Sequence, residues 1–209
     1  METWHEPAAD WRFRCTVPAA ASAVVAVRLW PQEALSSAPR VAVYGPQGRL
    51  GHRLLWSAPG EPLHVLLDGS EPGPRWCYIG PDLPDGPDWE APGGLVLASR
   101  HLARARVEDP AGIGISWEAG GAFTGRDLVP AIFHGFNPLG PDQQCVLRYQ
   151  GWFQAPAAGS YRFATISDDA SLLRIDGRDV LSWPGWHGAD AGRRGEHDVR
   201  LDLTAGRHA

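Results

Sequence analysis

Lysine is absent from this 209-residue sequence, and cysteine and methionine are rare, with three copies and one copy. Without lysine, no glycine-rich loop can supply the lysine that holds nucleotide phosphates in a P-loop. No apolar run approaches the length of about 20 residues that crosses a bilayer, so we expect no membrane span. The first residues also lack the basic segment and apolar core that are typical of a signal peptide.

Strong charge and catalytic motifs are missing as well. The formal net charge is −5 and there is no arginine-rich run, so we expect no nucleic-acid partner. Neither a G-x-S-x-G nucleophile motif nor an H-E-x-x-H metal motif occurs. We therefore predict that the protein is not an enzyme, and we assign no catalytic residue.

Glycine and proline, with 25 and 19 copies, separate many short apolar segments. This spacing is typical of short β-strands joined by turns, and it predicts an all-β fold. Residues 81–94 have the composition of a linker, but the strand expected at 95–99 moves the predicted boundary later. We predict two antiparallel β-sandwich-like domains, at residues 1–105 and 106–209. Strands are expected at 11–17, 23–30, 41–44, 53–56, 63–67, 75–79 and 95–99, then at 113–117, 133–138, 146–154, 160–166, 171–175, 180–183 and 197–203.

The stretch from Cys145 to Gly177 has the clearest pattern. Tyr161 and Phe163 alternate with polar residues, as side chains of a half-buried strand do. Asp176 and Gly177 form a two-residue hairpin signal, because both residue types tolerate the positive φ that a type I′ turn needs.

The motifs of this stretch resemble those of one known family. They are Tyr149-x-Gly151-x-Phe153-x-Ala155-Pro156, Gly159-Ser160-Tyr161-x-Phe163, Ser167-Asp168-Asp169 and Leu173-x-Ile175-Asp176-Gly177. Residues 106–209 resemble the β-sandwich domain named for the fourteen-kilodalton fragment of anthrax protective antigen. In that family, the turn at residues 204–206 is followed by one or two more strands, so the resemblance implies an open sheet edge here. The first half opens with a W-x-x-R-like strand and contains the segments VAVYGPQGRLGHRLL and RWCYIGPD. In these segments it is more loosely similar to β-sandwich domains of unknown function in bacterial surface proteins.

The resemblance also implies a metal site. Some members of the family bind sugars through Ca²⁺ held by a cis-linked aspartate pair, which corresponds to Asp168 and Asp169. Asp190 would replace an asparagine ligand of those proteins. Ca²⁺ prefers oxygen ligands, including carboxylates. In the alternative interpretation, the two carboxylates accept backbone hydrogen bonds and shape the turn. Ala170, where the family usually has glycine, is a departure from the pattern.

Two tryptophans in the loop SWPGWHGADAGRRG are candidates for sugar contact. Trp183 and Trp186 could stack on sugar rings, with His187 beside them, or they could fill the end of the sandwich. We expect one indole to be buried and the other exposed. The predicted ligand-binding residues are therefore Trp183, Trp186 and His187.

These features predict a carbohydrate-binding module of a bacterial surface or secreted protein, in the extracellular space or cell envelope. Its partner would be a glycan or cell-surface polysaccharide. One alternative is an assembly module that binds another protein chain at the open sheet edge, and another is an accessory domain of a glycoside hydrolase. Cys15 and Cys77 could form a disulfide, or both could be buried free thiols.

Overall fold

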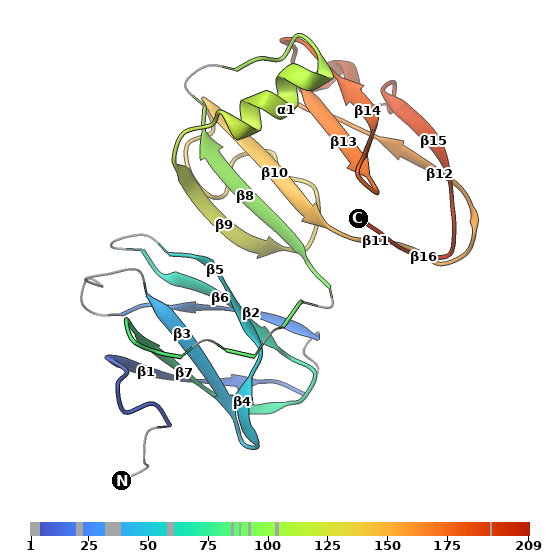
Figure 1. Cartoon of the computed structure of the whole chain (residues 1–209). Helices are drawn as coiled ribbons and strands as arrows, with labels where there is room; N and C mark the ends of the chain where they lie inside the picture. The colour runs from blue at the N-terminus through green and yellow to red at the C-terminus, as the bar shows by residue number, and fades with distance from the viewer. Residues whose placement is uncertain are drawn as a thin grey trace. The chain divides into compact units, whose positions relative to one another are not determined.

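The structure is a computed structural model of the whole chain (Figure 1). It describes residues 5–19, 23–31, 39–57, 61–84, 86–87, 89–91, 93–102, 105–192 and 194–209. Within these residues, β-strands predominate and a single α-helix occurs, which confirms the predicted all-β fold class. No helix in the described part of the chain is long and apolar enough to span a membrane.

The chain divides into two compact units. The first comprises Met1–Gly94 with Arg126–Leu128, and the second comprises Leu95–Gly125 with Val129–Ala209. The boundary between the two units therefore follows the proline-rich segment 81–94. Residues 85, 88 and 92 of this segment are not among the residues that the structure describes. The predicted boundary at residue 105 came later because the strand at Leu95–His101 was assigned to the first domain. The structure pairs this strand with a distant strand of the second unit.

The first unit contains two antiparallel sheets. One has the strand order β1-β7-β3-β4 and the other the order β2-β6-β5. The strands are β1 (Trp11–Val17), β2 (Val24–Leu29), β3 (Arg40–Gly45), β4 (Gly48–Leu50), β5 (His52–Trp56), β6 (Leu63–Asp68) and β7 (Gly73–Gly80).

Alternating apolar side chains from both sheets form the core of this unit. Val65 and Leu67 of β6 and Val43 of β3 are fully buried in one cluster. Residues two apart on a strand point to the same face, so each strand contributes alternate residues to this cluster. Burial of apolar area at about 25 cal/mol per Å² is the main stabilising contribution of such a core. These two facing sheets and their shared core make the first unit a β-sandwich.

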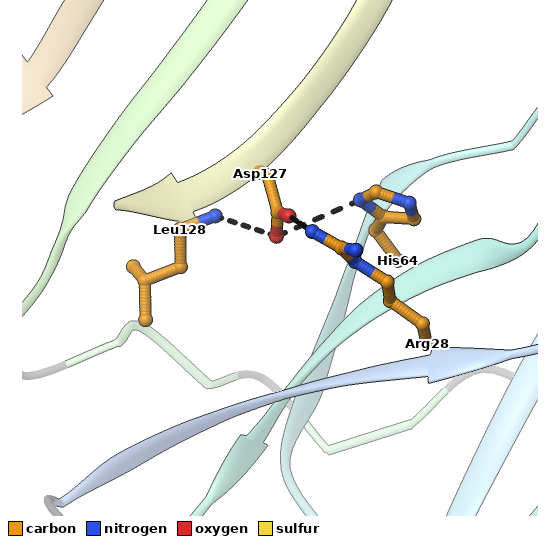
Figure 2. A network of polar contacts seen from close by, with 4 residues as sticks. All are labelled: Arg28, His64, Asp127 and Leu128. Carbon is orange, nitrogen blue, oxygen red and sulfur yellow. Dashed lines mark hydrogen bonds and ion pairs between the residues drawn. The ribbon is translucent and has the colours of Figure 1, made fainter. Parts of the chain in front are cut away.

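Figure 2 shows a polar network of four residues around Asp127. His64 alternates along β6 with the core residues Leu63 and Val65, so it lies on the opposite face of the strand. Arg28 of β2 and Asp127 form an ion pair, and Asp127 Oδ1 lies 3.6 Å from His64 Nδ1 of β6. The same carboxylate oxygen accepts a hydrogen bond from the Leu128 backbone N–H at 2.8 Å. Asp127 and His64 are both buried. This network therefore satisfies a buried carboxylate within the first unit, and we assign it a structural role.

The second unit is built from short antiparallel pairs. Its sheets have the strand orders β10-β8-β9, β11-β16, β12-β15 and β13-β14. The strands are β8 (Leu95–His101), β9 (Phe123–Val129), β10 (Cys145–Gly151), β11 (Phe153–Ala155), β12 (Gly159–Ala164), β13 (Ser171–Ile175), β14 (Arg178–Trp183), β15 (Asp198–Leu203) and β16 (Gly206–His208). Residues Arg126–Leu128 of β9 are assigned to the first unit. The helix α1 (Pro110–Glu118) contacts β10, β13 and β14.

Two strands predicted for this unit are absent. The segment predicted as a strand at 113–117 lies in α1. This helix is capped at its N-terminus by Asp109, whose side chain accepts the Gly112 N–H at 2.7 Å. The segment predicted at 133–138 is a loop in which Phe133 and Phe136 are exposed. The strand β9 between them was not predicted.

The hairpin between β13 and β14 confirms the predicted two-residue turn. Asp176 and Gly177 have φ values of 50° and 75°, and Ile175 pairs with Arg178. Positive φ at both central residues is the signature of a type I′ turn. On β12, Tyr161 and Phe163 lie on the inner face and contact the ring of Phe153 edge-on, at 5.3 and 5.2 Å between centroids. The central stretch therefore forms strands close to the predicted positions.

Candidate functional site

The Asp168–Asp169 turn connects β12 to β13, and its peptide bond is cis. Three hydroxyl groups lie at the base of the turn. The Thr165 and Ser171 hydroxyls are 2.7 Å apart, and the Ser167 hydroxyl donates to Ser171 at 2.9 Å. These bonds close the loop between the two strands, so the carboxylates are presented by an ordered turn.

A second loop is attached to this turn by one hydrogen bond. The backbone N–H of His187, which follows β14, donates to Asp169 Oδ1 at 3.0 Å. The neighbouring Asp168 is exposed, and its carboxylate has no protein partner among the residues that the structure describes. One carboxylate therefore shapes the loop, as the alternative interpretation expects, and the other faces solvent. The turn therefore carries one carboxylate that accepts a backbone hydrogen bond and one that is exposed.

The indole of Trp183 lies between two imidazole rings. The ring of His187 stacks on it at 3.6 Å with an interplanar angle of 9°, and the ring of His197 stacks at 3.9 Å and 15°. A Cβ atom at Gly192 would lie 2.6 Å from the Trp183 ring, so this close approach requires glycine. Trp183 is 8% exposed. Both of its faces are covered, so it cannot stack on a sugar ring as predicted.

His187 is also held by the protein. Its Nε2 lies 3.4 Å from the Trp183 carbonyl oxygen, and its Nδ1 is buried with no hydrogen-bond partner in the described part of the chain. The ring is fixed by the stack on Trp183 and the backbone by Asp169. His187 was predicted to contact sugar, but its contacts with Trp183 and Asp169 place it where it holds the loop.

Trp186 differs from its neighbours because 67% of it is exposed. It lies one residue before His187, whose backbone is anchored to Asp169. Ile166, which directly precedes the turn, is also exposed. The prediction that one tryptophan is buried and the other exposed is confirmed. The exposed indole belongs to a loop whose neighbouring residues are fixed, which is a suitable arrangement for a binding surface.

The predicted set of three metal ligands is not gathered in one place. Asp190 lies in the 3-10 helix Ala189–Gly192 and is exposed. No group of three or more His, Cys, Asp or Glu side chains that could hold a metal ion occurs among the described residues. Among the described residues, Asp168 and Asp169 are therefore the two carboxylates that could act as ligands of a cation at this turn. Backbone carbonyls, water or ligand hydroxyls would complete the six to eight oxygens that Ca²⁺ needs.

Three contributors to this region were not predicted: His197, Gly192 and Ile166. His197 directly precedes β15, and its backbone carbonyl accepts the Thr165 N–H at 3.0 Å. This contact continues the β12–β15 pairing beyond the strand ends. The pairing joins residues more than thirty positions apart, and no local pattern in the sequence indicates it.

A separate cavity of about 360 Å³ lies in the second unit. Its apolar lining comes from β13, β14 and β15, and its polar lining includes Asp176 and His208. His208 Nδ1 donates to Asp176 Oδ2 at 2.7 Å. This hydrogen bond raises the pKa of His208 above its ordinary value of 6.5, and it lowers the pKa of Asp176 below 3.8. The bond attaches β16 to the β13–β14 turn at the rim of the cavity.

Comparison with known proteins gives no match. No family model matches the sequence, and neither a curated protein nor a solved structure is significantly similar to the chain. The similarity to the protective-antigen domain therefore remains a prediction from the motifs.

Proposed function

We propose that the second unit is a non-catalytic carbohydrate-binding module in which Trp186 stacks on a sugar ring. The exposure of Trp186 beside an anchored loop is the observation that carries this proposal. The C–H face of a pyranose packs well on indole, and an aromatic side chain that is already positioned costs little entropy on binding. Trp183 and His187 fix the loop through the stack of their rings. The module would act in the extracellular space or the cell envelope.

Asp168 and Asp169 supply the polar half of the proposed site. Asp168 is exposed, while Asp169 uses one carboxylate oxygen to anchor His187. Two adjacent carboxylates are hard anionic ligands that suit Ca²⁺. A bound Ca²⁺ would supply positive charge that sugar hydroxyls can ligate, at a position next to the loop that carries Trp186. Asp190 takes no part in this proposal.

Titration of Ca²⁺ into chelator-treated protein tests the metal. We expect saturable heat from the wild type, because the carboxylate pair concentrates negative charge at one turn. The double variant Asp168→Ala/Asp169→Ala should lose this heat. Asp190→Ala is the matched control, since it removes an exposed carboxylate from a neighbouring loop, and it should bind as the wild type does. Absence of saturable heat from the wild type would contradict calcium binding and would leave the pair as a structural turn.

Assembly with another protein chain is the second candidate, and the cavity beside β14 and β15 favours it. Within the described residues, each of these strands pairs with one neighbour, β13 and β12 respectively. Val180 of β14 and Leu201 and Leu203 of β15 line the cavity. An extended segment of another chain could pair with a free strand edge and cover these apolar residues, as in β-strand addition.

Sedimentation velocity over a hundredfold range of concentration tests self-assembly by this route. The assembly candidate predicts a sedimentation coefficient that rises with concentration, because mass action favours association. Leu201→Asp should abolish the rise, since it places a charge in the apolar part of the cavity. Arg200→Asp, on the opposite face of the same strand, is the control and should leave it unchanged. A constant monomer at all concentrations would exclude self-assembly through this edge.

A further inference from the structure

Cys15 and Cys77 lie on neighbouring strands in the core of the first unit. In the antiparallel pairing of β1 with β7, Cys15 is opposite Arg75, and Phe13 is opposite Cys77. Residues opposite each other or two apart share a face of the sheet, so both thiols and Arg75 point to the same side. Cys77 is completely buried in the core cluster, and Cys15 packs against that cluster and is half-buried. Both cysteines are free thiols.

The surroundings of this pair are not those of an inert core cysteine. Arg75 is 3% exposed, and its guanidinium donates to the backbone carbonyls of Pro74 at 3.1 Å and Glu71 at 2.6 Å. Its Nε is buried and has no hydrogen-bond partner in the described part of the chain. A buried positive charge directly opposite Cys15 favours the thiolate, which is the reactive form of cysteine.

The two thiols are expected to differ in acidity, because they lie on the same face of neighbouring strands and Cys77 is the more deeply buried. Interaction with the Cys77 thiol lowers the pKa of Cys15 to about 7, and the charge of Arg75 acts in the same direction against the effect of burial. The same interaction, together with burial, raises the pKa of Cys77. Cys15 is thus the accessible nucleophile, and Cys77 is the buried thiol that resolves the mixed disulfide.

We propose that Cys15 and Cys77 form a redox-active thiol pair that low-molecular-weight disulfides convert to an intramolecular disulfide. The Cys15 thiolate attacks one sulfur of oxidised glutathione, which forms a mixed disulfide and releases one glutathione thiolate. Cys77 then gives its proton to that thiolate and attacks Cys15 Sγ, which releases the second glutathione as a thiolate. The two protein thiols are oxidised, and one molecule of oxidised glutathione is reduced to two molecules of glutathione.

The position of β1 allows this reaction. Diagonal neighbours in an antiparallel pair are about 7–8 Å apart, which is slightly more than the Cα–Cα distance of about 4.4–6.8 Å that a disulfide usually spans. Closing the bond therefore requires a small approach of β1 toward β7. Among the described strands, β1 is the edge strand of its sheet and pairs with β7 alone. A shift of an edge strand disturbs fewer contacts than a shift of a central strand.

Mass spectrometry of the intact chain tests the pair. The protein is incubated with oxidised glutathione at pH 8, and remaining thiols are then trapped with N-ethylmaleimide under denaturing conditions. We expect a product that has lost two hydrogens and carries a single maleimide, on Cys145. Its rate of formation should rise with pH through about 7, the pKa of Cys15, because only the thiolate attacks. Dithiothreitol should restore the three free thiols.

Variants separate this result from unspecific oxidation. Cys145→Ser should give the same oxidised product with no maleimide, and it leaves the core of the first unit unchanged. Cys15→Ser should give no loss of two hydrogens. A mixed disulfide with glutathione that persists on Cys15 in the wild type and in Cys145→Ser would overturn the proposal. Full reaction of all three cysteines with maleimide after the incubation would overturn it equally.

Discussion

Replacing Trp183 by alanine is expected to destabilise the second unit by about 3–5 kcal/mol. The indole is 8% exposed and is stacked between His187 and His197, so the substitution leaves a cavity between two aromatic rings. Gly192 approaches the same ring too closely for a Cβ, and the backbone around it cannot collapse without moving the 3-10 helix. The lower free energy of unfolding should be measurable by urea denaturation, monitored through the NMR signals of the histidine rings in this unit.

Trp186→Ala is the matched control for that experiment. It removes the same side chain three residues away, where it is 67% exposed. A surface substitution of this kind changes the free energy of unfolding by about 0.5 kcal/mol or less. Equal destabilisation by the two substitutions would contradict the assignment of Trp183 to the core and Trp186 to the surface.

The same substitution, Trp186→Ala, is expected to weaken glycan binding by about 30-fold. An exposed aromatic residue at the centre of a binding site commonly contributes about 2 kcal/mol, and each 1.4 kcal/mol is about a tenfold change in affinity. The loop should keep its conformation, because its anchors are the His187 N–H on Asp169 and the stack on Trp183. Affinity measured by titration with a bound glycan would therefore fall without a change in stability.

The Trp186→Tyr variant distinguishes the loss of aromatic stacking on the sugar from an indirect effect of the substitution on the loop conformation. Tyrosine also offers an aromatic face and should recover a large part of the affinity lost in Trp186→Ala. An alanine variant that binds as tightly as the wild type would remove Trp186 from the proposed site.

Local patterns in the sequence predicted most strands because alternation and turn residues act over a few positions. The strand at residues 171–175 and the Asp176–Gly177 turn were predicted at the positions they occupy. The helix α1 was missed because its sequence, PAGIGISWE, combines glycines with β-branched residues, which disfavour helix. Asp109 followed by Pro110 was an available signal, since both are favoured at a helix start.

Long-range pairing explains the remaining differences. The strand at Leu95–His101 was recognised, but its partner β10 lies about fifty residues later, so its unit could not be assigned from local sequence. In the candidate site, the exposed indole and the aspartate pair were predicted together. The burial of Trp183 was not assigned, because it depends on contacts with Gly192 and His197, nine and fourteen positions later in the chain, that no local pattern indicates.

Carbohydrate binding by the second unit can be tested directly on a glycan array, with the labelled protein in calcium and in a chelator. The wild type and Trp186→Ala would be compared at equal concentration. We expect that the wild type binds a defined class of glycans in calcium, that the chelator removes this binding, and that Trp186→Ala binds the same glycans far more weakly. A wild type that binds no glycan, or a Trp186→Ala variant with an unchanged array profile, would contradict the proposed carbohydrate-binding function.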